Sequence, residues 1–444
     1  MSIRSMFAVN AAKITGLVCR KLGRQGVTWA GKVALKLYPG ILKELSSQVR
    51  EKIIVVCGTN GKTTTNNMLC AALEAEGKKV VCNHTGSNML NGVVAAFVLA
   101  AGPGGRIDAD YACIEVDEAS TKHVFPALQP DYMVLTNLFR DQLDRYGEID
   151  ITMNILEEMI RTVPSMKLIV NGDDALSAYL AMDSGNPWVS YGVPEPVVES
   201  GLHEIREGRF CKRCGERLSY RFYHFSQLGD YECPKCGFKR PAADFCASDV
   251  EVSDHIAFTV EDRRLEANYK GFYNVYNMLA AYAGVRTAGL TADRFAEMLK
   301  GFHPENGRME QFKVNGADVV LNLAKNPAGF NQNIAAVMQD KRPKDLIILI
   351  NDNAQDGRDI SWLWDVDFDL LENETVWSIT VSGIRCQDMR LRLKYVDIPS
   401  ELIENVETAI DKKTREGTGN LYVLVNYTGL FGTRNILKKM EVNG

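Results

Sequence analysis

The stretch KIIVVCGTNGKTT, residues 52–64, decides the fold class of this chain. A short apolar run ends at Cys57, a glycine-rich turn follows it, and residues that favour a helix continue to about Glu76. Such a turn lets successive backbone N–H groups and the helix N-terminus face a phosphate, while Lys62 adds a positive charge. The stretch therefore predicts a phosphate-binding loop between a buried strand and a helix. Its candidate ligands are Gly58, Thr59, Asn60, Gly61, Lys62, Thr63 and Thr64.

Short apolar runs bounded by polar or turn residues predict further strands around this loop. In the first part of the chain these runs are 79–82, 111–116, 132–136 and 167–170, with a helix at 275–285. After Gly307 the alternation restarts, with strands at 319–323, 345–350, 376–381 and 421–425. We therefore expect an α/β chain with a central domain at 51–307 and a C-terminal domain at 308–444.

Composition narrows the class of protein. The chain has 444 residues, of which 46% are hydrophobic and 24% are charged, and its formal net charge is −5. These values predict two or three globular domains, and they offer no polycationic surface for nucleic acid. No apolar run is long enough to form a transmembrane segment, and the first residues lack the apolar core of an export signal. The expected location is the cytoplasm.

Residues 1–50 form a basic segment with apolar residues at roughly helical spacing. Up to residue 49, eight Lys or Arg side chains stand against the single acid Glu44. We expect helices that pack on the central domain and expose a solvated basic face. Contact of this segment with an anionic membrane surface is the alternative.

Four of the eleven cysteines form two CxxC pairs, Cys211 with Cys214 and Cys233 with Cys236, eighteen residues apart. They lie at about 206–241, where Cys, Gly, Arg and aromatic residues replace the α/β alternation, which is typical of an inserted module. Four thiolates satisfy tetrahedral Zn²⁺ and leave no position for a catalytic water. The spacing predicts a structural zinc ribbon rather than free or redox-active thiols.

Several segments, in the same order along the chain, resemble the Mur ligases and the related folylpolyglutamate synthetases. The phosphate loop is one residue shorter than the standard Walker A pattern, which is the form used by these ligases. IEVDE at 114–118 resembles their acidic strand end, and TN at 136–137 with DQLD at 141–144 resembles their TN…DHLD segment. GFYNVYNMLAA at 271–281 resembles their NxxNAxAA helix, and GRME at 307–310 resembles the element that joins their central and C-terminal domains.

This resemblance implies an ATP-binding central domain followed by a Rossmann-like α/β C-terminal domain. It adds Asn274, Asn277 and Arg308 to the ATP-binding residues of the loop, and it makes Arg308 and Lys62 catalytic. NGDD at 171–174 resembles the family's motif on the ribose side of the nucleotide.

The same resemblance implies a Mg²⁺ site. Mg²⁺ prefers oxygen ligands, and a carboxylate together with a hydroxyl of the phosphate loop is a sufficient contribution from the protein. Glu115 and Thr63 are the expected ligands, and Glu118 is the alternative carboxylate.

Four features of the sequence depart from the usual pattern of ligases that add an amino acid. Gln142 replaces the His of DHLD, and Lys325 stands where many relatives have the His of a DYAHNP-like segment. No lysine occurs at 143–166, where many relatives carry a carbamylated lysine. The phosphate loop also begins only about fifty residues into the chain, which is too few for the usual domain that holds the UDP end of a soluble precursor. Another form of substrate is therefore expected.

The segment NDNAQDGRDISWLWD, residues 351–365, resembles the signature of the MurT branch of the family. It follows a strongly apolar run, so its acids stand at the C-terminal edge of a strand, where open α/β sheets place ligands. The resemblance makes Asp356 a catalytic residue that faces the Cys and His of a partner. Asp352, Arg358 and Asp359 are interpreted as turn-forming and paired scaffold residues.

The MurT resemblance implies an ATP-dependent carbon–nitrogen ligase of peptidoglycan biosynthesis. Its expected reaction converts the α-carboxyl of D-glutamate in the lipid II stem peptide to D-isoglutamine through an acyl phosphate, with ATP, Mg²⁺ and Zn²⁺ as cofactors. Ammonia would come from a GatD-like glutaminase in a heterodimer. The chain contains no GxCxG nucleophile elbow, which agrees with a separate glutaminase. The lipid-linked substrate would be met at the inner face of the membrane.

Two alternatives stay open at this point. One is a Mur-like or folylpolyglutamate-like ligase that adds an amino acid, which the missing lysine and the Asp356 segment disfavour. The other is a zinc-binding scaffold gated by nucleotide without turnover, which Lys62, Glu115 and Arg308 disfavour.

Overall fold

The fold is built around the phosphate loop, as the sequence predicts. The computed structural model describes residues 3–21, 26–141, 149–197, 208–253, 255–268, 270–302 and 309–443. Strand β1 (Lys52–Cys57) runs into the loop, and helix α4 (Lys62–Ala75) leaves it. Five of the six residues of β1 are buried, because the strand lies inside a sheet that is covered on both faces.

The central sheet is parallel and has the order β2-β3-β1-β4-β5-β6-β9. Its remaining strands are β2 (Val80–Cys82), β3 (Tyr111–Glu115), β4 (Tyr132–Leu135), β5 (Lys167–Asn171), β6 (Trp188–Gly192) and β9 (Phe245–Cys246). β1 pairs with β3 on one side and with β4 on the other, so the loop after β1 lies between the C-terminal ends of both neighbours. The chain order reverses at this position, and open α/β sheets bind ligands there.

Alternate residues of β1 belong to the two hydrophobic layers of the domain. Val55 and Cys57 face a core built with α5 (Leu90–Ala100), α6 (Thr121–Leu128), α8 (Ile149–Arg161) and α9 (Ala175–Ser184). Ile54 and Val56 face a second core built with α4, α10 (Tyr273–Thr287) and α11 (Phe295–Gly301). The helix predicted at 275–285 corresponds to α10.

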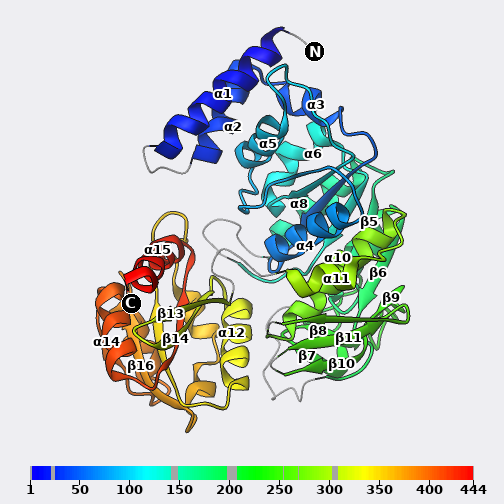
Figure 1. Cartoon of the computed structure of the whole chain (residues 1–444). Coiled ribbons are helices and arrows are strands. Elements are labelled where there is room, and N and C mark those ends of the chain that lie inside the picture. The colour runs from blue at the N-terminus through cyan, green and yellow to red at the C-terminus, as the bar shows by residue number, and fades with distance from the viewer. Residues whose placement is uncertain are drawn as a thin grey trace.

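The basic N-terminal segment forms helices α1 (Ile3–Lys21), α2 (Gly26–Leu37) and α3 (Ile41–Ser46). They pack on the first core through small residues, among them Ala8, Ala12, Ala30 and Ala34. Figure 1 shows α1 and α2 at one end of the molecule, beside α5 and α3. Within the described residues, no helix is both long enough and apolar enough to cross a membrane.

The cysteine-rich insertion contains a β-hairpin of β7 (Ser219–Phe225) and β8 (Leu228–Glu232). Gln227, in the turn of this hairpin, donates to the Leu138 carbonyl and to Asp174, each at 2.7 Å. A three-stranded antiparallel sheet follows, formed by β10 (Ser248–Val252), β11 (Ile256–Val260) and β12 (Arg263–Ala267). This small sheet is not among the strands predicted from the sequence.

The C-terminal domain has a second α/β sheet of order β13-β14-β18-β15-β16-β17. Its strands are β13 (Glu310–Val314), β14 (Ala317–Leu323), β15 (Lys344–Leu349), β16 (Val376–Ser382), β17 (Glu401–Leu402) and β18 (Asn420–Val425). Only β13 is antiparallel to its neighbour. Helices α12 (Pro327–Gln339), α13 (Cys386–Lys394), α14 (Val406–Glu416) and α15 (Tyr427–Asn443) accompany the sheet, and α12 lies toward the central domain in Figure 1.

Candidate active site

The phosphate loop is held by the end of the neighbouring strand β4. Thr59 N donates to the Asn137 carbonyl at 2.8 Å, and Asn60 N donates to Asn137 Oδ1 at 2.9 Å. The Thr136 hydroxyl donates to the Asn60 carbonyl at 2.8 Å. Gly58 and Gly61 have φ values of +119° and +83°, which L side chains rarely adopt. The glycines are therefore required for the shape of the loop, and the TN pair fixes its position.

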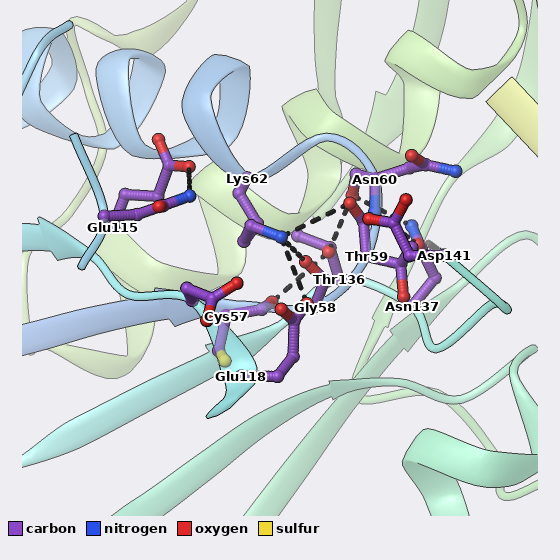
Figure 2. Close-up of polar contacts among 12 residues, drawn as sticks. Cys57, Gly58, Thr59, Asn60, Lys62, Glu115, Glu118, Thr136, Asn137 and Asp141 are labelled. Carbon is purple, nitrogen blue, oxygen red and sulfur yellow. Dashed lines mark hydrogen bonds and ion pairs between the residues drawn. The ribbon is translucent and has the colours of Figure 1, made fainter. Parts of the chain in front are cut away.

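Lys62 points back into the loop, as Figure 2 shows. Its Nζ donates to the carbonyls of Gly58 and Thr59 and forms an ion pair with Glu118 at 3.1 Å. The side chain is only 7% exposed. Burial alone would lower the pKa of Lys62, but the carboxylates of Glu118, Asp117 and Glu115 raise it above its ordinary value. Lys62 is therefore cationic in this loop.

The two acids considered for Mg²⁺ have different surroundings. Glu115, 2% exposed, accepts from the Thr63 hydroxyl at 2.7 Å and from Asn88 Nδ2 at 2.8 Å. Glu118 faces Lys62 instead, and burial raises its pKa to about 7 although Lys62 lowers it. Thr63 and Glu115 thus form the hydroxyl–carboxylate pair that a hard cation prefers. Their oxygens fit Mg²⁺ at this position.

A cleft of about 400 Å³ opens beside the loop. This volume is within the usual range of small-molecule sites. The central domain contributes the residues of the loop from Thr59 to Thr64, Glu115, and both Asn274 and Asn277 of α10. Asn277 Nδ2 donates to Asn274 Oδ1 at 3.0 Å, and Asn277 Oδ1 accepts from the Thr65 hydroxyl at 3.4 Å. The predicted nucleotide residues on α4 and α10 therefore meet at one site.

The C-terminal domain closes the other side of the same cleft. Lys325 forms an ion pair with Asp141 at 2.5 Å, and the side-chain amides of Asn326 and Asn60 are hydrogen-bonded at 3.1 Å. A further ion pair joins Arg140 to Asp365. The segment with the unusual Lys325 is therefore in direct contact with the phosphate loop region. Further lining residues from this domain are Asn322, Leu323, Gly329, Gln332, Asn333, Gln355, Tyr427, Leu430 and Phe431.

Asp356 lies behind this cleft rather than on its surface. It is 4% exposed and accepts from Thr428 N at 2.8 Å, from the Thr428 hydroxyl and from Asn353 N at 3.2 Å. Burial raises the pKa of Asp356, although the hydrogen bonds from Thr428 lower it. Asp356 thus caps the first turn of α15, while its neighbour Gln355 lines the cleft. The scaffold interpretation of Asp352 agrees with its ion pair to Arg385 at 2.7 Å.

Several residues singled out in the sequence are not in the cleft. Asn171, Asp173 and Asp174 are completely buried, and their partners are protein groups. Asp173 binds Arg240 and Tyr276, and Asp174 binds Ser177 and Gln227. NGDD therefore anchors the insertion to the central sheet. Arg308, Gln142 and Asp144 lie outside the described residues.

The four cysteines of the insertion come together as predicted. Their Sγ atoms all lie within 4.8 Å of one another, with Cys211–Cys236 and Cys214–Cys233 separations of 3.5 Å. Burial raises the pKa of Cys211, whereas at Cys233 the backbone N–H groups of Cys236 and Lys235 outweigh the effect of burial and lower the pKa. The cluster fits tetrahedral Zn²⁺ with four protein ligands, which release their protons when the metal binds.

Two features of the site were not predicted from the sequence. Asn83 donates to the Glu115 carbonyl and accepts from Glu115 N, each at 2.8 Å, and Asn88 binds the Glu115 carboxylate. The contact of Asn60 with Asn326 joins residues 266 positions apart. Isolated asparagines in loops carry no periodic signal, so neither feature could be found from hydrophobic pattern alone.

Comparisons with known proteins agree with this geometry. Residues 56–215 match the family model "Mur ligase middle domain", and residues 323–430 match "MurT ligase C-terminal". Among solved structures, a pseudomurein peptide ligase type C from Methanothermus fervidus has a TM-score of 0.70 at 24% identity, and covers 92% of this chain and 84% of its own. MurF from Acinetobacter baumannii has a TM-score of 0.66 at 16% identity, with 92% and 80% coverage. These two structures share the fold.

Curated relatives are more similar in sequence. A protein of Staphylococcus aureus (strain COL) named "Lipid II isoglutaminyl synthase (glutamine-hydrolyzing) subunit MurT" is 36% identical over 431 residues, which are 96% of each chain. Its namesake from Streptococcus pneumoniae (strain ATCC BAA-255 / R6) is 32% identical over 448 residues, or 100% of this chain and 99% of the relative. The chain therefore belongs to the MurT family of Mur ligases.

Proposed function

We propose that this chain is the ligase subunit of a lipid II isoglutaminyl synthase. It would convert the α-carboxyl of D-glutamate in the lipid II stem peptide to an amide, with ammonia from a glutaminase partner and energy from ATP. The observation that carries this proposal is the shared cleft, in which the phosphate loop meets the MurT-type C-terminal domain through Lys325–Asp141 and Asn60–Asn326. Similarity to MurT subunits over nearly the whole chain supports the choice of substrate.

Different residues of the cleft would bind the ATP phosphates and Mg²⁺ in the first half-reaction. Lys62 and the N–H groups of the loop would bind the ATP phosphates, and Arg308 would add a second positive charge. Thr63 and Glu115 would hold Mg²⁺, which when bound neutralises the triphosphate. A carboxylate oxygen of the substrate attacks the γ-phosphorus, ADP leaves, and an acyl phosphate remains on the substrate.

The second half-reaction needs ammonia and little water. Ammonia attacks the carbonyl carbon of the acyl phosphate, phosphate leaves, and loss of a proton gives the amide. Water would compete for the acyl phosphate, so closure of the C-terminal domain over the cleft favours amidation. Lys325 and Asn326 are suited to this closure because they already contact the central domain.

Asp356 would connect the two subunits. Its carboxylate is buried against the first turn of α15, and its neighbour Gln355 lines the cleft. We assign to Asp356 the passage or orientation of ammonia from a GatD-like partner, whose catalytic Cys and His it would reach if the segment 351–356 moves on binding. The zinc ribbon would be structural, since four cysteines complete the coordination of the metal.

Reconstitution with lipid II tests the function directly. The protein would be incubated with a glutamate-containing lipid II, ATP and Mg²⁺, with either ammonia or glutamine plus the candidate glutaminase, and the products analysed by mass spectrometry. The acid-to-amide change lowers the mass by about one unit. We expect this change with ammonia alone, and with glutamine only when the partner is present. ATP consumption only when an amino acid is supplied and appended would instead establish the amino-acid-adding alternative.

One variant tests the assignment of Asp356. Asp356→Asn keeps the size of the side chain and one capping acceptor, so we expect a folded protein that still binds ATP but has lost amidation. Asp359→Asn is the matched control, because Asp359 lies in the same segment and accepts only from Ser361 N among the hydrogen bonds resolved for it. Full amidation by Asp356→Asn would refute this role.

We place the proposed activity at the inner face of the membrane, and the N-terminal helices support binding to a membrane surface. Helix α1 exposes Ile3, Phe7 and Ile14, at 86%, 65% and 62% of their surface. Arg4 lies on the same helix, and Lys32 and Lys36 lie on the neighbouring α2. Exposed apolar side chains beside cationic ones favour binding to the interface of an anionic bilayer. A substrate with a lipid anchor would be met there.

A further inference from the structure

A second group of metal-ligand side chains lies on the flank of the phosphate-loop helix. Cys70 belongs to α4, Cys82 ends β2, and His84 follows two residues later. Their ligand atoms all lie within 4.8 Å of one another, and Cys70 Sγ is 4.0 Å from His84 Nε2. None of these residues belongs to the cysteine-rich insertion or lines the nucleotide cleft.

The separations suit a small thiophilic cation. Ligands of tetrahedral Zn²⁺ at about 2.3 Å for sulfur and 2.0–2.1 Å for nitrogen are about 3.6–3.8 Å apart, so small movements would complete the site. Cys70 is buried, Cys82 is half-buried and His84 is exposed, so a metal ion can reach the group from solvent. Two thiols and one imidazole favour zinc over the hard cation expected at Thr63 and Glu115.

The surroundings of Cys82 support a ligand role. Asn66 Nδ2 donates to Cys82 Sγ at 3.2 Å, and a donor of this kind stabilises a thiolate. Asn66 itself is buried on α4, one turn before Cys70. The group therefore has both ligands and an outer hydrogen bond that orients one of them.

We propose that Cys70, Cys82 and His84 bind a second zinc ion, with the fourth coordination position open to solvent. Zinc binding displaces the protons of the two thiols, so the affinity for zinc will fall as the pH is lowered. This inference does not depend on the proposed amidation reaction.

The position of the group gives the metal a role near the nucleotide. His84 begins the segment 84–88, whose last residue, Asn88, donates to the carboxylate of Glu115. Within the same segment, Gly86 lies against Thr63 and Glu115. Bound zinc would tie this segment to α4 and so fix the surroundings of the Thr63–Glu115 pair. Loss of the metal should weaken ATP binding without affecting the four-cysteine cluster.

Zinc content per chain tests the proposal. The full-length protein and its variants would be expressed with added zinc, purified with reductant, dialysed against a weak chelator, and analysed by elemental mass spectrometry. We expect His84→Ala and Cys82→Ser each to contain one zinc fewer per chain than the unmodified protein. The matched controls His123→Ala and Cys246→Ser change an exposed histidine and an exposed cysteine outside both groups, and should keep the full content.

The result is the difference in zinc content between each variant and the unmodified protein. It therefore does not depend on how fully the four-cysteine cluster is occupied by zinc. His84 is exposed, so His84→Ala should fold normally, and far-UV circular dichroism would verify this. Native protein should also resist alkylation at Cys82, whereas His84→Ala should be alkylated there. Equal zinc content in all variants would overturn the proposal, and so would a Cys70–Cys82 disulfide in place of the metal.

Discussion

Glu115 and Glu118 are three positions apart, yet their side chains serve different groups. Glu115 accepts from Thr63 and Asn88, whereas Glu118 pairs with Lys62. Glu115 is the last residue of β3, whereas Glu118 is the first residue of the short helix η1 (Glu118–Ser120). The change of backbone direction between these two elements points the carboxylates at different groups. The position of a carboxylate relative to the loop, rather than its presence in an acidic run, therefore decides which charge it meets.

Removal of the Glu115 carboxylate should weaken Mg²⁺ binding. We expect Glu115→Gln to raise the Mg²⁺ concentration that gives half-maximal ATP hydrolysis by about tenfold or more, because a hard cation loses its charged ligand. Glu118→Gln should change this concentration much less. The measurement is the ATPase rate as a function of Mg²⁺ at saturating ATP. A larger shift in Glu118→Gln would transfer the ligand role to Glu118.

Glu118 should also make stability depend on pH. Its pKa is about 7 in the folded protein and 4.5 ordinarily, so between these values the folded state holds a proton that the unfolded state has released. The free energy of unfolding should thus fall as the pH rises from about 4.5 through 7, by about 2–3 kcal/mol in total. Glu118→Gln should remove this part of the decrease. Urea denaturation at several pH values measures it, with the exposed Glu372→Gln as control; identical profiles for all three proteins would contradict the assignment.

At the scale of elements, strands with continuous apolar runs were predicted closely. β1 has the predicted bounds, and β14, β15, β16 and β18 lie within a few residues of theirs. The sheet of β10, β11 and β12 was missed although β11 has the apolar run IAFTV, because β10 has no buried residue and β12 has only two. The cysteine cluster was found because ligand spacing is a local signal. In contrast, the hydrogen bond between Gln227 and Asp174 of NGDD joins residues 53 positions apart, and no local pattern reveals it.

The hairpin of β7 and β8 should depend on the zinc ribbon. Cys211, Cys214, Cys233 and Cys236 flank the hairpin on both sides, so bound metal fixes its two ends. We expect Cys214→Ser, or a strong chelator, to increase hydrogen exchange at 208–241 and to lower the melting temperature, while ATP binding persists. Cys246→Ser is the control for loss of a cysteine outside the cluster. Zinc-free protein of unchanged stability would contradict the structural role.

Helix α1 should determine binding to membranes. Replacing Ile3, Phe7 and Ile14 by Ser removes three exposed apolar side chains and leaves the buried Ala8 and Ala12 in place. Each such side chain contributes about 1 kcal/mol or more when it enters the interface, so we expect at least a tenfold loss of binding to anionic vesicles. Co-sedimentation with phosphatidylglycerol vesicles measures this. Trp377→Ser, on the C-terminal domain, is the exposed control; equal binding by all three proteins would exclude α1 as the docking element.

At the scale of the whole molecule, one cleft depends on two separately folded sheets. The phosphate loop belongs to the first sheet, and Lys325 and Asn326 follow β14 of the second. Both sheets present the C-terminal ends of parallel strands to the cleft, where polar side chains can converge on one ligand. Lys325 stands where many relatives have a histidine, and its partner Asp141 lies on the central domain. This replacement therefore changes a contact between the two domains.

Lys325 and Asp141 should act as a pair in domain closure. Both side chains are partly shielded from solvent, so we expect Lys325→Met or Asp141→Asn to raise the KM for ATP about three- to tenfold and to increase the radius of gyration in X-ray scattering. The double variant should be no worse than either single one, because the residues share one contact. Lys313→Met is the matched control, since Lys313 pairs with Asp318 inside the C-terminal domain. Additive effects on KM, or an unchanged radius of gyration in both single variants, would show that closure does not depend on this pair.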